Sequence, residues 1–104
     1  MKWIGTLSAL RKVTVYIEGF DWDDADIAHI AQHGVEPEEV EEVFYNEPLV
    51  RRSRDGRYIA LGQSWAGRYL AVIFELRPGN VVRVVTARPM TKAERQLYRR
   101  RARR

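Results

Sequence analysis

Hydrophobic and polar residues alternate along VTVYIEGF, residues 13–20, where the apolar positions Val13, Val15 and Ile17 are all β-branched. A period of two with side chains of this shape is typical of a β-strand. The pattern therefore predicts a strand near the start of the chain.

Helical periodicity follows, beginning at Asp23 or Asp24, either of which can accept a hydrogen bond from the free backbone N–H groups of a first turn. Gly34 stands where this helix would end, at a position that favours a left-handed residue. The apolar face of the predicted helix consists of Ile27, Ile30 and Ala31.

A second helix is predicted in EPEEVEEVFYN, residues 36–46. Pro37 falls in its first turn, where a missing N–H costs nothing, and the glutamates crowd the N-terminal half, where the helix dipole favours negative charge. The buried face of this helix consists of Val40, Val43 and Phe44. Both helices are expected to be short, acidic outside and apolar inside.

Beyond Pro48 the period returns to two residues, and turn signals separate four apolar runs. The runs are LVRRS at 49–53, RYIALGQSW at 57–65, RYLAVIFEL at 68–76 and VVRVVTA at 81–87. The turn signals are Asp55-Gly56, Ala66-Gly67 and Arg77-Pro78-Gly79-Asn80. These short connections predict an antiparallel meander of four strands, the last two apolar enough to be covered by helices on one side.

Residues 91–104 are predicted to form a basic C-terminal helix, because Thr91 and Glu94 can build a reciprocal capping box worth on the order of 1 kcal/mol. The apolar stripe of this helix consists of Met90, Ala93 and Leu97. The order of strand, two short helices, meander and helix defines a small α+β domain.

The composition fits one globular domain spanning residues 1–104, with 45% apolar and 31% charged residues. The chain has no cysteine, which excludes disulfides and thiolate chemistry, and no apolar run approaches the roughly 20 residues of a membrane span. No secretory signal is recognised, so a cytoplasmic location is expected. Residues 1–12 are interpreted either as an N-terminal extension that forms a strand or short helix, or as the product of an upstream start codon.

The charges divide between two parts of the chain. Residues 18–47 hold 11 of the 14 acidic groups and no lysine or arginine, whereas residues 48–104 hold 15 of the 18 basic groups against three acids. A basic pole of this kind binds polyanions through phosphate contacts. The alternative is that the two poles neutralise each other across the fold.

Six segments between residues 20 and 98 then occur in a specific order. They are FDWD at 20–23, QHGV at 32–35, EEVEEVF at 38–44, RYIALG at 57–62, GRYLAVIF at 67–74 and VRVVTARPMTKAERQLY at 82–98. In this order they resemble the BrnT-type toxins of bacterial and archaeal toxin-antitoxin pairs.

The resemblance implies a RelE-like fold and a metal-independent endoribonuclease, without a cofactor, that cleaves RNA and inhibits translation. It also implies neutralisation by a cognate DNA-binding antitoxin, so that operator DNA is bound only through the complex of the two proteins. Assembly as a homodimer or a heterotetramer, with no membrane partner, is the corresponding expectation.

Two charged positions of the family pattern are replaced in this chain. Gln32 stands where a lysine usually precedes His-Gly-Val, and Gly56 stands where an acidic residue usually precedes the strand arginine; His29 takes a position that is commonly Asn. These replacements favour an alternative function, a non-catalytic basic module that binds nucleic acid. A third hypothesis is an interaction protein whose basic surface docks an acidic partner.

Metal-free RNA cleavage requires a base for the 2′-OH, cations for the phosphorane and an acid for the leaving 5′-oxygen. Histidine transfers protons near neutral pH, and arginine donates two hydrogen bonds to a phosphate. The predicted catalytic residues are His33 as base or acid, Arg57, Arg83 and Arg88 as phosphate ligands, and Tyr98 as a stacking or proton-relay residue. The predicted RNA-binding residues are Arg51, Arg52, Arg68, Lys92, Arg95 and Arg99.

Each candidate also has a purely structural interpretation. An imidazolium at His33 would favour the dipole at a helix end, and Arg57 would be a solvated charge at the start of a strand. Arg83 and Arg88 are an odd number of residues apart, so they point to opposite faces unless the strand ends or bulges between them. Tyr98 lies one position off the apolar stripe, as a half-buried packing residue would.

His29 and His33 share a helical face with Asp26, a spacing that could bind zinc. The glutamate of zinc proteases is absent and no third strong ligand is evident, so no metal site is predicted. The aromatic residues that could stack on bases are Tyr16, Trp22 and Trp65. A core position is the favoured interpretation for all three.

Overall fold

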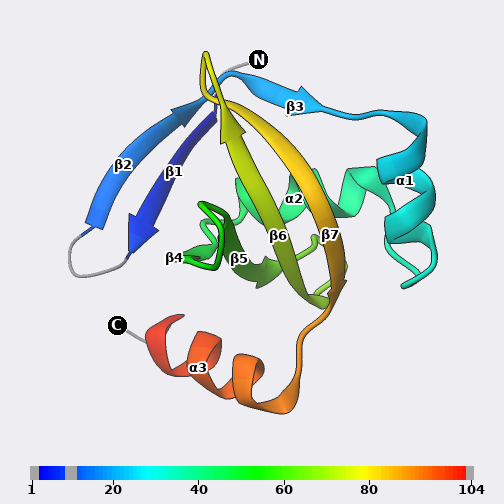
Figure 1. The fold of residues 1–104 in the computed structure, drawn as a ribbon. Helices are drawn as coiled ribbons and strands as arrows, with labels where there is room; N and C mark the ends of the chain where they lie inside the picture. Colours follow the sequence, from blue (N-terminus) through cyan, green and yellow to red (C-terminus); the bar gives the residue numbers. More distant parts are fainter. Residues whose placement is uncertain (1–2, 9–11, 103–104) are drawn as a thin grey trace.

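The computed structural model describes residues 3–8 and 12–102, which form seven strands and three helices (Figure 1). The strands are β1 (Trp3–Ser8), β2 (Lys12–Ile17), β3 (Gly19–Asp21), β4 (Leu49–Arg52), β5 (Tyr58–Gln63), β6 (Tyr69–Arg77) and β7 (Val81–Pro89). The helices are α1 (Asp24–Ala31), α2 (Pro37–Tyr45) and α3 (Lys92–Ala102). The predicted α+β class is confirmed.

The predicted meander is also confirmed, because β4, β5, β6 and β7 pair antiparallel in chain order. The turn signals lie where the backbone needs a positive φ. The residues with positive φ in these turns are Asp55, Gly56, Gly67, Gly79 and Asn80. Residues of these types reach such conformations at little cost, so the local sequence determines where each strand ends.

The strand predicted at residues 13–20 was wrong as a single element. It is divided into β2 and β3, which lie at opposite edges of one sheet with the order β2-β1-β4-β5-β6-β7-β3. Only Glu18 separates them, and its N–H donates to the carbonyl of Asn80 at 3.0 Å. Consecutive Cα atoms are about 3.8 Å apart, so the two edges approach within about 8 Å and the sheet curls strongly.

The predicted N-terminal extension contains a strand where it is described. Residues 3–8 form β1, which pairs antiparallel with β2 and parallel with β4. Residues 1–2 and 9–11 lie outside the described residues.

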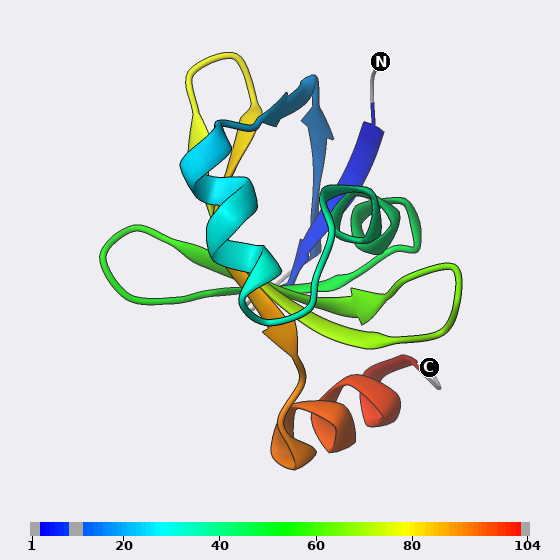
Figure 2. The ribbon, with the colours of Figure 1, turned by 90° about the vertical axis from the view of Figure 1, so that its right-hand side faces the viewer.

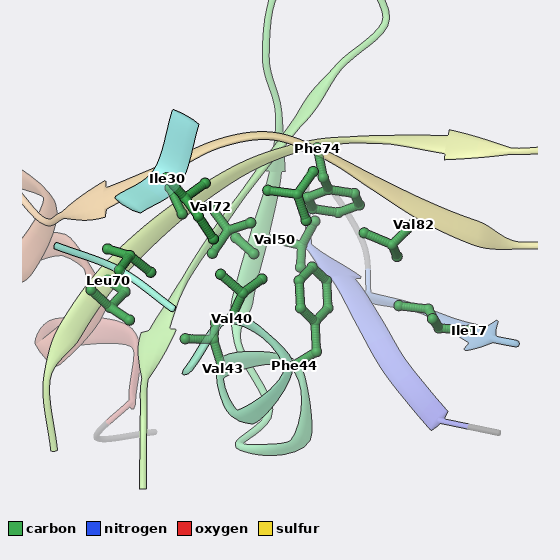
Figure 3. Close-up of a cluster of buried hydrophobic side chains, with 14 residues drawn as sticks. Ile17, Ile30, Val40, Val43, Phe44, Val50, Leu70, Val72, Phe74 and Val82 are labelled. Atoms are coloured by element: carbon green, nitrogen blue, oxygen red, sulfur yellow. The ribbon is translucent and has the colours of Figure 1, made fainter. Parts of the chain in front are cut away.

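Helix α2 fills the concave side of the curled sheet (Figures 2 and 3). Its predicted buried face is confirmed, because Val40, Val43 and Phe44 are all buried against strand residues. The Phe44 ring meets the rings of Phe20 and Phe74 edge-on, with centroids 5.4 and 5.1 Å apart. This aromatic group lies at the centre of the main core.

The predicted inner face of α1 was partly wrong. Ile30 is fully buried, but Ala31 is exposed, and Asp26 is only 8% exposed. The predicted caps are confirmed, since Asp23 accepts from the N–H of Asp26 at 2.7 Å and Gly34 has a φ of 71°. The side chain of Asp26 lies 3.6 Å from Arg83 Nη2 of β7, so the face of α1 that carries Asp26 is turned toward β7.

Helix α3 packs on the opposite side of the sheet (Figure 2). The Thr91–Glu94 capping box is confirmed, with reciprocal bonds of 2.8 and 3.1 Å. The predicted stripe was wrong at Ala93, which is exposed, whereas Tyr98 is only 8% exposed. The side chains that pack in this second cluster include Leu61, Ala71, Met90, Leu97 and Tyr98. Among the described residues, no other helix packs on this sheet face, which we call the outer face.

Candidate nucleic-acid interface

A β-bulge in β7 brings two candidate residues to the same face. Phe74 of β6 pairs with Val84 and Ile73 pairs with Thr86, so Val85 has no partner on β6. One extra residue reverses the alternation of side chains beyond it. Arg83 and Arg88 therefore both point to the outer face, although an odd spacing separates them.

Two further arginines reach the outer face through the strand register. Arg51 pairs with Ile59, which packs in the α3 cluster, and residues directly opposite each other share a face. Arg57 lies beside Glu75, the direct partner of Arg83. We call Arg51, Arg57, Arg83 and Arg88 the arginine face.

Carboxylates of the chain hold two of these guanidinium groups together. Glu75 accepts from Arg83 Nη1 at 3.2 Å and from Arg57 Nε at 3.5 Å, and Arg83 Nη2 lies 3.6 Å from Asp26. The hydrogen bond from Arg83 holds the pKa of Glu75 below its ordinary value. Burial raises the pKa of Asp26, and the neighbouring charge of Asp23 raises it further, while Arg83 opposes both effects.

Arg88 is held by a bidentate pair with Glu94, with distances of 2.7 and 3.0 Å. Its Nη1 also donates to the carbonyl of Pro89 at 3.3 Å. Three of the five guanidinium N–H groups are thereby used, which leaves Nε–H and one Nη2–H for a ligand. Glu94, which caps α3, thus also orients Arg88.

This pair makes folding stability depend on pH. The hydrogen bond from Arg88 is the largest cause that lowers the pKa of Glu94 in the folded protein. A lowered acid pKa gives stability that is present above the unfolded value, about 4.3, and is lost as pH falls through the folded value. In Glu94→Gln, the unfolding free energy should therefore fall less steeply below about pH 4 than in wild type.

Urea unfolding at a series of pH values measures this difference, with Glu38→Gln on the exposed side of α2 as a control for the loss of one carboxylate. Parallel pH profiles for Glu94→Gln and wild type would show that the pair contributes nothing to acid sensitivity.

His33 lies apart from these ion pairs. Its exposed ring meets that of His29 with centroids 5.8 Å apart, and no hydrogen bond joins it to another catalytic candidate within the described residues. His33 lies two residues beyond the end of α1, so it stands farther along the direction of that helix than Asp26 does. Because α1 runs beside β7 (Figures 1 and 2), this is the direction of Arg88.

Tyr98 is a packing residue. Its ring contacts that of Tyr69 edge-on with centroids 6.0 Å apart. Burial, with a smaller effect from Tyr69, raises the pKa of the Tyr98 phenol. The phenol is therefore neutral at physiological pH and can donate a hydrogen bond, but is a poor base.

The predicted RNA-binding residues fall on different surfaces. Arg52 is the next residue after Arg51 along β4, so its side chain points to the opposite side of the sheet, away from the outer face. Arg68 is also on the helical side, where Nη1 donates to Glu39 and to the carbonyl of Gly34 at 2.9 Å each. The three candidates on α3 are exposed. They are Lys92, Arg95 and Arg99.

The aromatic candidates also divide. Trp22 is partly buried and its Nε1 donates to Glu41 at 2.9 Å, so the core interpretation is confirmed there. It was wrong for Trp65, which is 70% exposed. The side chain of Tyr16 lies outside the described residues.

Sequence reasoning missed the ion-pair partners of the arginines, Glu75 and Asp26, and it assigned Glu94 to the capping box alone. A signal for Glu75 was present, because in a tight β6–β7 hairpin it lies opposite Arg83.

Within the described ranges, no three His, Asp or Glu residues cluster as a metal site would require. None of the helices described has the length and hydropathy to span a membrane.

The fold and the arginine face together define a small basic α+β domain of the kind that acts on nucleic acid. Residues 22–94 match the model of the family described as ribonuclease toxin, BrnT, of type II toxin-antitoxin system, and the chain belongs to this family. A comparison with curated proteins found no match. The resemblance seen in the sequence is confirmed, and family membership implies an RNA target and a cognate antitoxin.

Proposed function

We propose that this toxin cleaves RNA on the arginine face, through attack of a 2′-OH on the adjacent phosphate without a metal ion, and thereby inhibits translation. The observation that carries the proposal is the bulge at Val85, since it gathers the arginines of β7 on one open face. Family membership supports ribonuclease activity, and the geometry supports the location.

In this mechanism Arg88 binds the scissile phosphate and stabilises the charge of the phosphorane, and Arg83, whose partner on β6 lies four residues or about 14 Å from that of Arg88, binds a neighbouring phosphate. Each is already oriented by a carboxylate, so little reorganisation is needed when the substrate arrives. Preorganised donors of this kind supply a large part of the rate enhancement of many enzymes. The remaining N–H groups of Arg88 are the first contacts we assign to the phosphate.

Proton transfer is assigned to His33, as base or acid, because it is an exposed histidine just beyond the end of α1, the helix that packs along β7. An imidazole populates both protonation states near neutral pH, as this role requires. Tyr98 is assigned only the donation of a hydrogen bond, since its raised pKa makes it a poor base.

A non-catalytic RNA-binding module is the alternative. It is favoured by one observation, that the exposed His33 makes no hydrogen bond to another catalytic candidate within the described residues. The two functions differ in their product, because only the first leaves cut RNA. A cytoplasmic location, assembly as a homodimer or as a heterotetramer with the antitoxin, and operator binding through that complex stay predictions.

The neighbouring residues Arg51 and Arg52 provide a matched test. Both are exposed, but only Arg51 lies on the arginine face. Arg51→Ala should weaken RNA binding and reduce the slope of log affinity against log salt by about 0.7, the value for one lost phosphate contact on a single strand. Arg52→Ala should keep the wild-type slope.

Fluorescence anisotropy with labelled RNA at several salt concentrations measures both variants. Equal losses in the two variants would mean that binding follows net charge and not the arginine face.

A further inference from the structure

Trp65 is the one large hydrophobic side chain that is mostly exposed among residues 17–101. It lies in the turn between β5 and β6, and its backbone N–H donates to Glu42 Oε1 at 3.0 Å. Its ring lies beside that of Tyr45, with centroids 6.4 Å apart and planes inclined by 39°. The turn is thus fastened to α2 while the indole face remains open.

An open cavity of about 440 Å³ adjoins this indole. The residues that line it are Asn46, Gln63, Ser64, Trp65, Gly67 and Tyr98. We call it the Trp65 cavity.

Two amide side chains give the Trp65 cavity a defined polarity. Asn46 Nδ2 donates to the carbonyl of Gln63 at 2.8 Å, and Gln63 Nε2 donates to the carbonyl of Gly67 at 3.3 Å. Because both partners are carbonyl oxygens, the amino ends of the two amides must be the ends engaged. Their side-chain oxygens accept no hydrogen bond within the described chain, so they are available to a ligand that carries N–H groups.

The strand register places the Trp65 cavity within reach of Arg88. Arg88 pairs with Ala71, and Gln63 lies two strands away from Arg88 and two residues further along the sheet. With strands about 4.8 Å apart and a rise of about 3.4 Å per residue, the backbone positions of Arg88 and Gln63 are roughly 12 Å apart. Helix α3 lies between them, with Arg95 4.8 Å above the ring of Tyr69.

We propose that the Trp65 cavity binds one unpaired base of the RNA, stacked on Trp65 and read through an exocyclic amino group by Asn46 and Gln63. The inference rests on the proposed function, because the same RNA strand would place a phosphate at Arg88. The chemistry fits, since aromatic faces stack on any base and free carbonyl oxygens accept from amino groups. The exposed cations of α3 would bind the phosphates of the RNA that lie between the two sites.

The test uses 2′-O-methyl oligonucleotides, which lack the 2′-OH and cannot be cleaved by its attack. Trp65→Ala should lower their affinity by about 5- to 100-fold, the range expected for one lost stacking contact. The salt dependence should stay that of wild type, because no ion pair is lost. Trp65→Phe should retain part of the affinity, and Trp22→Phe, in the core cluster, is the matched control and should keep all of it.

The amide contacts are tested with two pyrimidines. Cytosine carries an amino group where uracil carries a carbonyl. Wild type should bind 2′-O-methyl oligo(C) more tightly than oligo(U), and Gln63→Ala should reduce that preference. An equal affinity of wild type for the two oligonucleotides would overturn the assignment of the amides.

The outcomes separate this inference from the proposed function. If Arg88→Ala stops cleavage while Trp65→Ala binds RNA as wild type does, the function stands and the base site is wrong. If wild type cuts no RNA but Trp65→Ala still weakens oligonucleotide binding, the base site stands alone. If Trp65→Ala loses only the affinity for the cognate antitoxin, the surface docks a protein and the base site is again wrong.

Discussion

Arg88→Ala is expected to abolish growth arrest and to lower RNA cleavage by roughly 10²- to 10³-fold, the range for loss of one preorganised donor group. Within the arginine face, Arg88 makes the most hydrogen bonds, two to Glu94 and one to the carbonyl of Pro89. Its loss removes both of the N–H groups that remain for a phosphate. The measurement is the rate of cleavage of a labelled RNA by purified protein.

Arg88→Lys is the matched variant, because lysine keeps the charge but cannot donate in the planar fork of arginine. We expect it to recover part of the activity, with cleavage between the wild-type and alanine rates. The thermal unfolding curve of each variant checks that the fold is intact. A folded Arg88→Ala that cleaves at nearly the wild-type rate would remove Arg88 from the site.

Phe44→Ala is expected to lower the free energy of unfolding by about 3–5 kcal/mol. Phe44 is 1% exposed and joins α2 to Phe20 of β3 and Phe74 of β6 in the main core. Small domains have only about 5–15 kcal/mol of net stability, so this loss is a large fraction of the whole. Urea unfolding followed by tryptophan fluorescence measures it.

Leu97→Ala is the comparison for the second cluster. Leu97 is only partly buried, and α3 contacts a single face of the sheet, so we expect less than half of the loss seen at Phe44. Equal losses at the two positions would contradict the assignment of the main core to the concave side.

The meander and the helix caps could be predicted because their determinants are local. Asp55 and Gly56 accept positive φ, and Thr91 and Glu94 need only each other to form a cap. Such signals do not depend on the position of distant segments. The separation of β2 from β3 could not be predicted, because alternation continues through Glu18 while the partner strand changes.

The candidate site was predicted as a set of residue types but not as an arrangement. The bulge at Val85 depends on pairing with β6, so the shared face of Arg83 and Arg88 could not be derived from their spacing. The burial of Asp26 could not be derived from local spacing either, because its ion-pair partner Arg83 lies on a distant strand. Tyr98 is buried and Ala93 is exposed, contrary to the predicted stripe, because α3 packs with Tyr98 against Tyr69 and Leu61 of the sheet.

Ion pairs connect the acidic part of the chain, residues 18–47, with the basic part, residues 48–104. Arg68 binds Glu39 of α2, and Arg83 binds Asp26 of α1, so some charge is neutralised across the domain. The cations on α3 and Arg51 are exposed, and the strand register places Arg51 on the sheet face that α3 covers. Neutralisation across the fold therefore applies at Arg68 and Arg83, whereas the exposed cations of α3 and Arg51 keep a basic surface.

Cleavage of a labelled RNA by the purified protein in excess EDTA tests the central claim most directly, with the chemical end of each fragment analysed. The account predicts fragments that end in a 2′,3′-cyclic phosphate, formed by wild type and lost in Arg88→Ala. RNA that is bound but left intact, or cut only when a divalent metal is restored, would contradict it.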